Sequence, residues 1–71
     1  MLSPSEKNVL LTFREYLVNP GEMLCFSGPD LEKHESALQQ LTNKDMLVKE
    51  HFKGAYFLTH AGFEAMKTCD Q

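Results

Sequence analysis

The residue types that most often bind metals in proteins are scattered through this chain. Two cysteines and three histidines are present, and both types are usual zinc ligands. None of them occurs at a short spacing such as Cys-x-x-Cys or His-x-x-x-His, which would place two ligands side by side. A metal site would need distant residues to converge, so we expect neither a metal nor a cofactor. The five residues are Cys25, His34, His51, His60 and Cys69.

Residues suited to catalysis are not grouped in a familiar motif either. The sequence has no Gly-rich phosphate loop, no nucleophile elbow and no pair of carboxylates in a recognisable setting. Ser27-Gly28-Pro29-Asp30 is more simply a turn that leads into a helix cap at Asp30. A chain of 71 residues also has little room for a deep pocket. We therefore expect no enzymatic activity.

A set of amide, hydroxyl and amino side chains could instead contact nucleic acid. At about 100° per residue they lie on one face of a helix expected over residues 31–43, away from its leucines. Gln and Asn can pair with adenine edges, and Ser and Lys can contact bases or phosphates. A polar face exposed only to water is an equally good interpretation, and Glu32 on this face disfavours phosphate. The candidate residues are Ser36, Gln39, Gln40 and Asn43 on this face, Lys33 at its edge, and Lys44 at the end of the helix.

A β-hairpin is predicted after this helix. At Met46 the period of apolar residues changes from about 3.6 to 2, which indicates a hairpin over residues 46–59 with its turn at Lys53-Gly54. Basic side chains near its tip could contact the phosphate backbone or the minor groove. Lysines on a short exposed strand can also serve only to discourage aggregation. These residues are Lys49, His51 and Lys53.

A first helix is predicted near the N-terminus. Ser3 can be its N-cap, Pro4 fits the first helical position, and Glu6 can complete a capping box. Apolar residues then recur at spacings of three and four, and Asn19-Pro20-Gly21 is expected to end the helix. The residues expected to face the core are Val9, Leu10, Phe13, Tyr16 and Leu17.

The remaining segments are a short central one and a last helix. Residues 22–27 are too few to assign and could form a short helix or a strand. Thr59 is expected to cap the last helix, in which Gly62 allows close packing. Phe52, near the tip of the hairpin, is expected to fold back over the sheet; the alternative is an exposed ring suited to a partner surface or a dimer contact. Phe63 and Met66 are expected to face the core, and His34 to be partly buried.

The second half of the chain resembles winged helix-turn-helix domains. In that family a recognition helix is followed by a turn, a strand, a wing, a strand ending in Leu-Thr, and a helix with Gly near its start. The similar segments are Leu38-Gln39-Gln40-Leu41, Asp45-Met46-Leu47-Val48-Lys49 and Tyr56-Phe57-Leu58-Thr59-His60-Ala61-Gly62, which holds the specific pattern Tyr-x-Leu-Thr-x-x-Gly.

This resemblance covers about residues 31–67 and implies a small α+β fold. Three helices are expected, with a C-terminal β-hairpin wing followed by the final helix. Only residues 21–30 are available for the helix that precedes the recognition helix in the family, so that helix is expected to be short or replaced.

The function implied by the resemblance is binding of duplex DNA by a small transcriptional regulator. Residues 31–43 would enter the major groove, and the 46–59 wing would contact the backbone. A module this small would need a homodimer or a protein partner for specific binding. The alternative is a protein-protein interaction module on the same scaffold without DNA binding, which the net charge of −3 and the pair Glu32 and Glu35 favour.

Composition limits the chain to one domain spanning residues 1–71. Its 42% hydrophobic content is that of a globular protein. No apolar run approaches the roughly 20 residues of a membrane-spanning helix, and the N-terminus lacks the features of an export signal. The two cysteines have no close spacing, so reduced thiols are expected. These features predict a cytoplasmic protein without a membrane partner.

Overall fold

The computed structural model describes residues 2–68 and begins with a capped helix, α1, at Pro4–Glu15. The Ser3 hydroxyl accepts a hydrogen bond from the Glu6 N–H at 3.2 Å, and the Glu6 carboxylate accepts one from the Ser3 N–H at 2.7 Å. This capping box satisfies N–H groups that the first helical turn leaves without partners. The predicted helix start is therefore confirmed, and Phe13 in the helix's apolar stripe is fully buried.

The end of α1 differs from the prediction. The helix ends at Glu15, before Asn19-Pro20-Gly21, because Leu17 adopts a left-handed conformation with φ of 56° and Val18 turns back into the core. Once the chain leaves the helix, the helical period no longer decides which side chains are buried. Tyr16 and Leu17 are accordingly 65% and 79% exposed, so their predicted burial was wrong.

The central segment that the sequence left open forms a short strand, β1, at Met23–Cys25. It pairs antiparallel with β3, at Ala55–Leu58, with Leu24 opposite Tyr56. No helix lies between α1 and the next helix among the described residues.

The second helix, α2, spans Gly28–Asn43. It starts two residues before the predicted cap at Asp30, because Gly28 and Pro29 already form its first turn, and the Ser27 N-cap makes no side-chain hydrogen bond. Asp30 lies inside that turn, where the positive end of the helix dipole stabilises its carboxylate. The end of the helix at Asn43 agrees with the prediction. Its buried face is made of Leu31, Ala37, Leu38 and Leu41.

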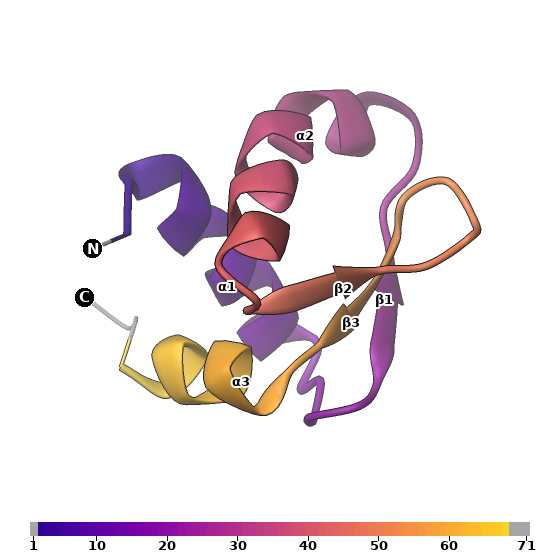
Figure 1. Cartoon of the computed structure of the whole chain (residues 1–71). Coiled ribbons are helices and arrows are strands. Elements are labelled where there is room, and N and C mark those ends of the chain that lie inside the picture. Colours follow the sequence, from indigo (N-terminus) through magenta and orange to yellow (C-terminus); the bar gives the residue numbers. More distant parts are fainter. Residues whose placement is uncertain (1, 69–71) are drawn as a thin grey trace.

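The predicted hairpin is confirmed, although its paired strands are shorter than residues 46–59. β2, at Leu47–Lys49, pairs antiparallel with β3, with Val48 opposite Phe57. Residues 50–54 form the connecting loop, which extends beyond the paired strands (Figure 1). The strand order β1-β3-β2 places β3 in the centre of the sheet.

The third helix, α3, spans His60–Lys67 and is capped by Thr59, as predicted. The Thr59 hydroxyl accepts a hydrogen bond from the Gly62 N–H at 3.0 Å and donates one to the Asp45 carbonyl oxygen at 2.8 Å. Gly62 is buried, and a Cβ atom there would clash with the Met46 carbonyl oxygen. The close packing expected at Gly62 is therefore confirmed, and Met66 is buried as expected.

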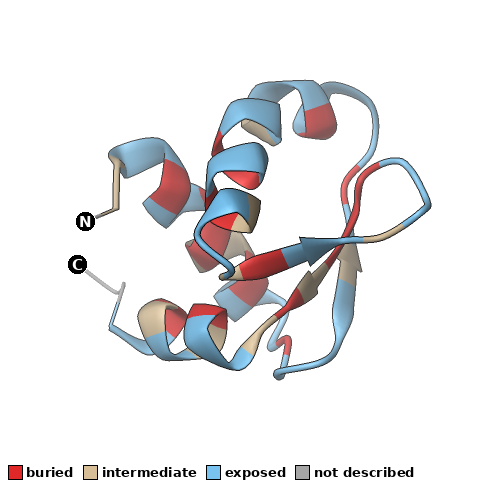
Figure 2. Cartoon of the chain, viewed as in Figure 1, coloured by how far each residue is buried: buried red, intermediate tan, exposed pale blue. Residues whose placement is uncertain are grey.

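The helices and the sheet together make a small α+β fold with one core (Figures 1 and 2). Helix α1 contacts both α2 and α3, and α2 also contacts β2. The largest fully buried side chains come from the helices and the hairpin, and include Phe13, Leu10, Leu38, Leu47 and Leu58. Within residues 2–68, no helix combines the length and apolar character needed to cross a membrane.

Replacing Gly62 with Ala tests the contact between α3 and Met46, in the turn between α2 and β2. The added methyl group meets backbone rather than a flexible side chain, so G62A should lower the free energy of unfolding by about 2–3 kcal/mol. Urea denaturation followed by far-UV circular dichroism measures this change. The exposed neighbour provides the control, since A61S should change stability by about 0.5 kcal/mol or less. Equal midpoints for both variants would contradict the close packing.

Candidate interaction surface

The residues expected on the polar face of α2 are all exposed. Ser36, Gln40 and Asn43 recur at spacings of four and three residues, so they share one side of the helix. Lys33 and Gln39 are exposed beside this row. The predicted polar face is thus present on the surface. None of these five side chains makes a hydrogen bond within residues 2–68.

The structure brings this helix face next to the hairpin. Gln39 of α2 and Lys49 of β2 line one hollow together with Glu35 and Tyr56. Lys53 of the loop lines a second hollow with Glu32 and Glu35. Two of the three hairpin residues predicted as ligand contacts therefore lie beside α2. We call the exposed side of α2 together with Lys49 and loop 50–54 the α2–loop surface.

Carboxylates match lysines in number on the α2–loop surface. Lys49 and Lys53 each share a hollow with Glu35, so both lysines face a negative charge. The position of Lys49 is also set by Tyr56, since its Nζ atom lies 5.9 Å from the centre of that ring. On this surface the charged residues are Lys33, Lys49 and Lys53 against Glu32, Glu35 and Glu50, whereas Asp30 lies in a different hollow beside β1.

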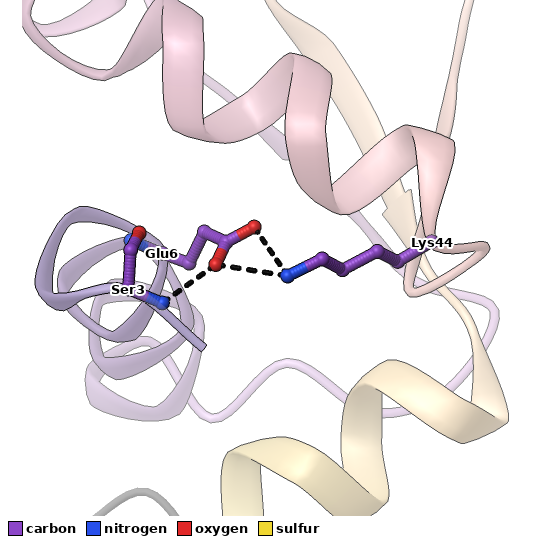
Figure 3. Close-up of polar contacts among 3 residues, drawn as sticks. All are labelled: Ser3, Glu6 and Lys44. Carbon is purple, nitrogen blue, oxygen red and sulfur yellow. Dashed lines mark hydrogen bonds and ion pairs between the residues drawn. The ribbon is translucent and has the colours of Figure 1, made fainter. Parts of the chain in front are cut away.

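Lys44, the remaining lysine predicted to contact a ligand, forms an ion pair with Glu6 (Figure 3). Its Nζ atom donates a hydrogen bond to Glu6 Oε1 at 3.0 Å and lies 2.8 Å from Oε2. The Glu6 side chain is 2% exposed and that of Lys44 is 38% exposed. The ammonium group is therefore directed toward α1 rather than toward the α2–loop surface.

Burial alone would raise the pKa of the Glu6 carboxyl group, because a charge is costly away from water. The hydrogen bond and charge of Lys44, together with the Ser3 N–H, stabilise the carboxylate more strongly, so the net pKa lies below its ordinary value of 4.5. Glu6 is consequently charged in the folded protein at neutral pH.

The aromatic side chains of the hairpin have opposite environments. Tyr56 is buried, and this burial, followed by the negative charge of Glu35, raises the pKa of its hydroxyl group above 10.0. Phe52 is 70% exposed. Its predicted packing over the sheet was wrong, because loop 50–54 has left the strand and does not follow its alternation. An exposed aromatic residue at this position was the alternative that the sequence also offered.

The histidines lie apart from one another, and the described residues contain no group of three His, Cys, Asp or Glu side chains placed to hold a metal. His34 is half-buried, as expected, and packs edge to face against Phe26 with the two ring centres 5.9 Å apart. His51 is exposed in the loop. Cys25 carries a free, exposed thiol, and Cys69 lies outside the described residues.

Comparisons of the chain with protein-family models, with curated proteins and with solved structures give no match. The geometry and charge of the α2–loop surface are therefore the basis for a functional proposal.

The Glu6–Lys44 pair can be tested by a double-mutant cycle. K44M leaves the buried carboxylate without its ammonium partner, and we expect the free energy of unfolding at neutral pH to fall by about 1–3 kcal/mol. In the E6Q/K44M double variant no charge remains buried. Its free energy of unfolding should therefore fall by less than the sum of the decreases in E6Q and in K44M. Chemical denaturation measures all four proteins. Additive losses would show that the two side chains do not interact.

The same pair predicts a dependence on pH. Because the folded-state pKa of Glu6 is below its ordinary value of 4.5, its stabilisation is fully present above that value. The stabilisation is lost as the pH falls through the lower folded-state pKa. Between about pH 5 and pH 3 the wild type should therefore lose stability more steeply than E6Q. Parallel curves for the two proteins would contradict the pKa assignment.

Proposed function

We propose that this chain is a protein-protein interaction module whose partner binds the α2–loop surface. The observation that carries the proposal is Phe52, a large aromatic side chain that is 70% exposed in a loop surrounded by charged residues. Aromatic anchors with a polar rim are typical of protein interfaces, where one or two such residues supply most of the binding energy.

The charges of the surface support a protein partner more than a polyanion. A phosphate that approached Lys53 would also meet Glu32 and Glu35, which line the same hollow. These carboxylates repel phosphate at close range. A protein partner can instead offer side chains of both signs around a pocket for Phe52.

The scaffold of the module is proposed to be a winged-helix variant in which β1 stands where the family has its positioning helix. Support comes from the order of α2, β2, the loop, β3 and α3, which matches the family's order from the recognition helix to the final helix. The Tyr-x-Leu-Thr-x-x-Gly pattern lies at the step from β3 to α3. In such a variant the helix that orients the recognition helix on DNA is missing. This difference also favours the protein-binding role.

Photo-crosslinking from the loop tests the proposal. A benzoylphenylalanine placed at position 52 should give one discrete covalent protein adduct in cells that express the chain. The control is the same group at position 60 on α3, where the His60 side chain is 80% exposed and lines neither hollow of the α2–loop surface nor the hollow beside β1. The isolated partner should then bind F52S at least about tenfold more weakly than the wild type, as expected for an anchor residue. The absence of an adduct specific to position 52 would overturn the proposal.

Binding of duplex DNA is the second candidate, favoured by one observation. Ser36, Gln40 and Asn43 form an exposed row on α2, and these side-chain types can contact base edges. Lys33, Lys49 and Lys53 are the cations available beside it.

A DNA titration at two salt concentrations tests the second candidate function. Three phosphate contacts would weaken binding by about 40-fold between about 50 and 200 mM salt. Amide shifts should then appear at Ser36, Gln40, Lys49 and Lys53, and K53A should lower the salt dependence by about one phosphate contact. If no salt-dependent shift occurs at these four residues, the DNA candidate is excluded.

A further inference from the structure

The free edge of β1 has main-chain N–H and C=O groups that pair with no other described strand. β1 pairs only with β3 on its other side. The Leu58 N–H donates to the Glu22 carbonyl oxygen at 3.0 Å, and the Phe26 N–H donates to the Gly54 carbonyl oxygen at 2.7 Å. Main-chain groups alternate in direction along a strand, so those of Met23 and Cys25 point away from β3. Both residues are exposed.

A negatively charged hollow lies directly beside this edge. It is bounded by the end of α1, by β1 and by the start of α2, and its lining includes Glu15, Leu24, Asp30 and His34. No lysine or arginine lines it. Neither Glu15 nor Asp30 has an ion pair in the part of the chain that the structure describes. The hollow therefore offers two uncompensated carboxylates next to an unpaired strand.

From these observations we propose that the β1 edge binds an extended basic peptide as an added strand, with a Lys or Arg side chain of the peptide in the hollow. Side chains alternate between the two faces of a sheet. Leu24 points to the hollow side, whereas Met23 lies in register with Phe57 and Val48 across the outer face. The peptide residue next to Leu24 meets Glu15 and Asp30, and its neighbours contact Met23 and Cys25.

The opposite edge of the sheet does not offer the same site. The Glu50 N–H donates to the Ala55 carbonyl oxygen at 2.9 Å, so the main-chain groups of Lys49 point outward from β2. A lysine on an edge strand discourages the addition of another strand, and a second cation there would repel a basic peptide. β1 has no charged residue among its three positions.

A second copy of this chain is a poorer occupant than a basic peptide. Two β1 edges placed together would bring Glu15, Glu22 and Asp30 of both copies close to one another. Each copy also carries a net charge of −3, which adds to the repulsion. The complementary charge of a Lys- or Arg-containing strand removes this penalty.

Fluorescence anisotropy with a labelled hexapeptide of alternating valine and lysine tests the binding. Saturable binding is expected below about 1 mM, and a peptide with glutamate in place of lysine should not bind. The double variant E15Q/D30N should bind at least about fivefold more weakly, whereas E32Q/E35Q on the other side of α2 should bind like the wild type. Circular dichroism of each variant checks that it is folded. No saturable binding, or equal loss in both variants, would overturn the proposal.

N-methylated peptides test whether the peptide adds as a strand. Methyl groups on the amides that face β1 remove hydrogen bonds, whereas methyl groups on the other amides point to solvent. Two peptides are compared, one methylated on its valine amides and the other on its lysine amides. One of them should therefore bind about tenfold more weakly, and the other should bind as the unmethylated peptide does. Equal behaviour of the two contradicts strand addition, and so does a dimer in sedimentation equilibrium that the peptide does not dissociate.

This inference does not rest on the proposed function of the α2–loop surface. F52S should bind the hexapeptide as the wild type does, because Phe52 does not line the hollow beside β1. Loss of peptide binding in F52S would show that the two surfaces are one site and would overturn a separate β1 site.

Discussion

The buried carboxylate of Glu6 connects the start of α1 to the end of α2. It closes the capping box with the Ser3 N–H at the start of α1 and forms the ion pair with Lys44 at the end of α2. A buried charge is tolerated only when charges and hydrogen bonds satisfy it, so both contacts must form together. They hold α1 against α2 at the point where the chain turns into β2. The position of the hairpin beside α2 therefore depends on this pair.

That constraint also affects which charges reach the surface. Because Lys44 is directed to Glu6, it does not add a cation to the α2–loop surface, where carboxylates already match lysines in number. Structural use of one lysine thus weakens the attraction for phosphate at the neighbouring helix face. The side chains left for recognition are the amides of α2 and the aromatic ring of Phe52, and this combination suits a protein surface better than a phosphate backbone.

Local signals predicted much of the fold, and long-range contacts account for what could not be predicted. The caps at Ser3 and Thr59 and the change of period at Met46 depend on residues a few positions apart, so they are readable in the sequence. β1 is stabilised by β3, more than twenty-five residues later in the chain, and the partner of Lys44 lies 38 residues away. The orientation of Phe52 follows from a loop that leaves the strand, which periodicity does not describe.

One place where local rules are broken is the end of α1, which bounds the hollow beside the β1 edge. Leu17 adopts a left-handed conformation that usually belongs to glycine and costs about 1 kcal/mol, yet its side chain is exposed and gains no burial. Tyr16 is exposed next to it and lines the hollow that contains Glu15 and Asp30. A small protein with little stability to spare would bury these side chains if stability alone selected them. Exposed apolar groups, uncompensated carboxylates and unpaired main-chain groups at one edge are instead what a binding site for an extended chain requires.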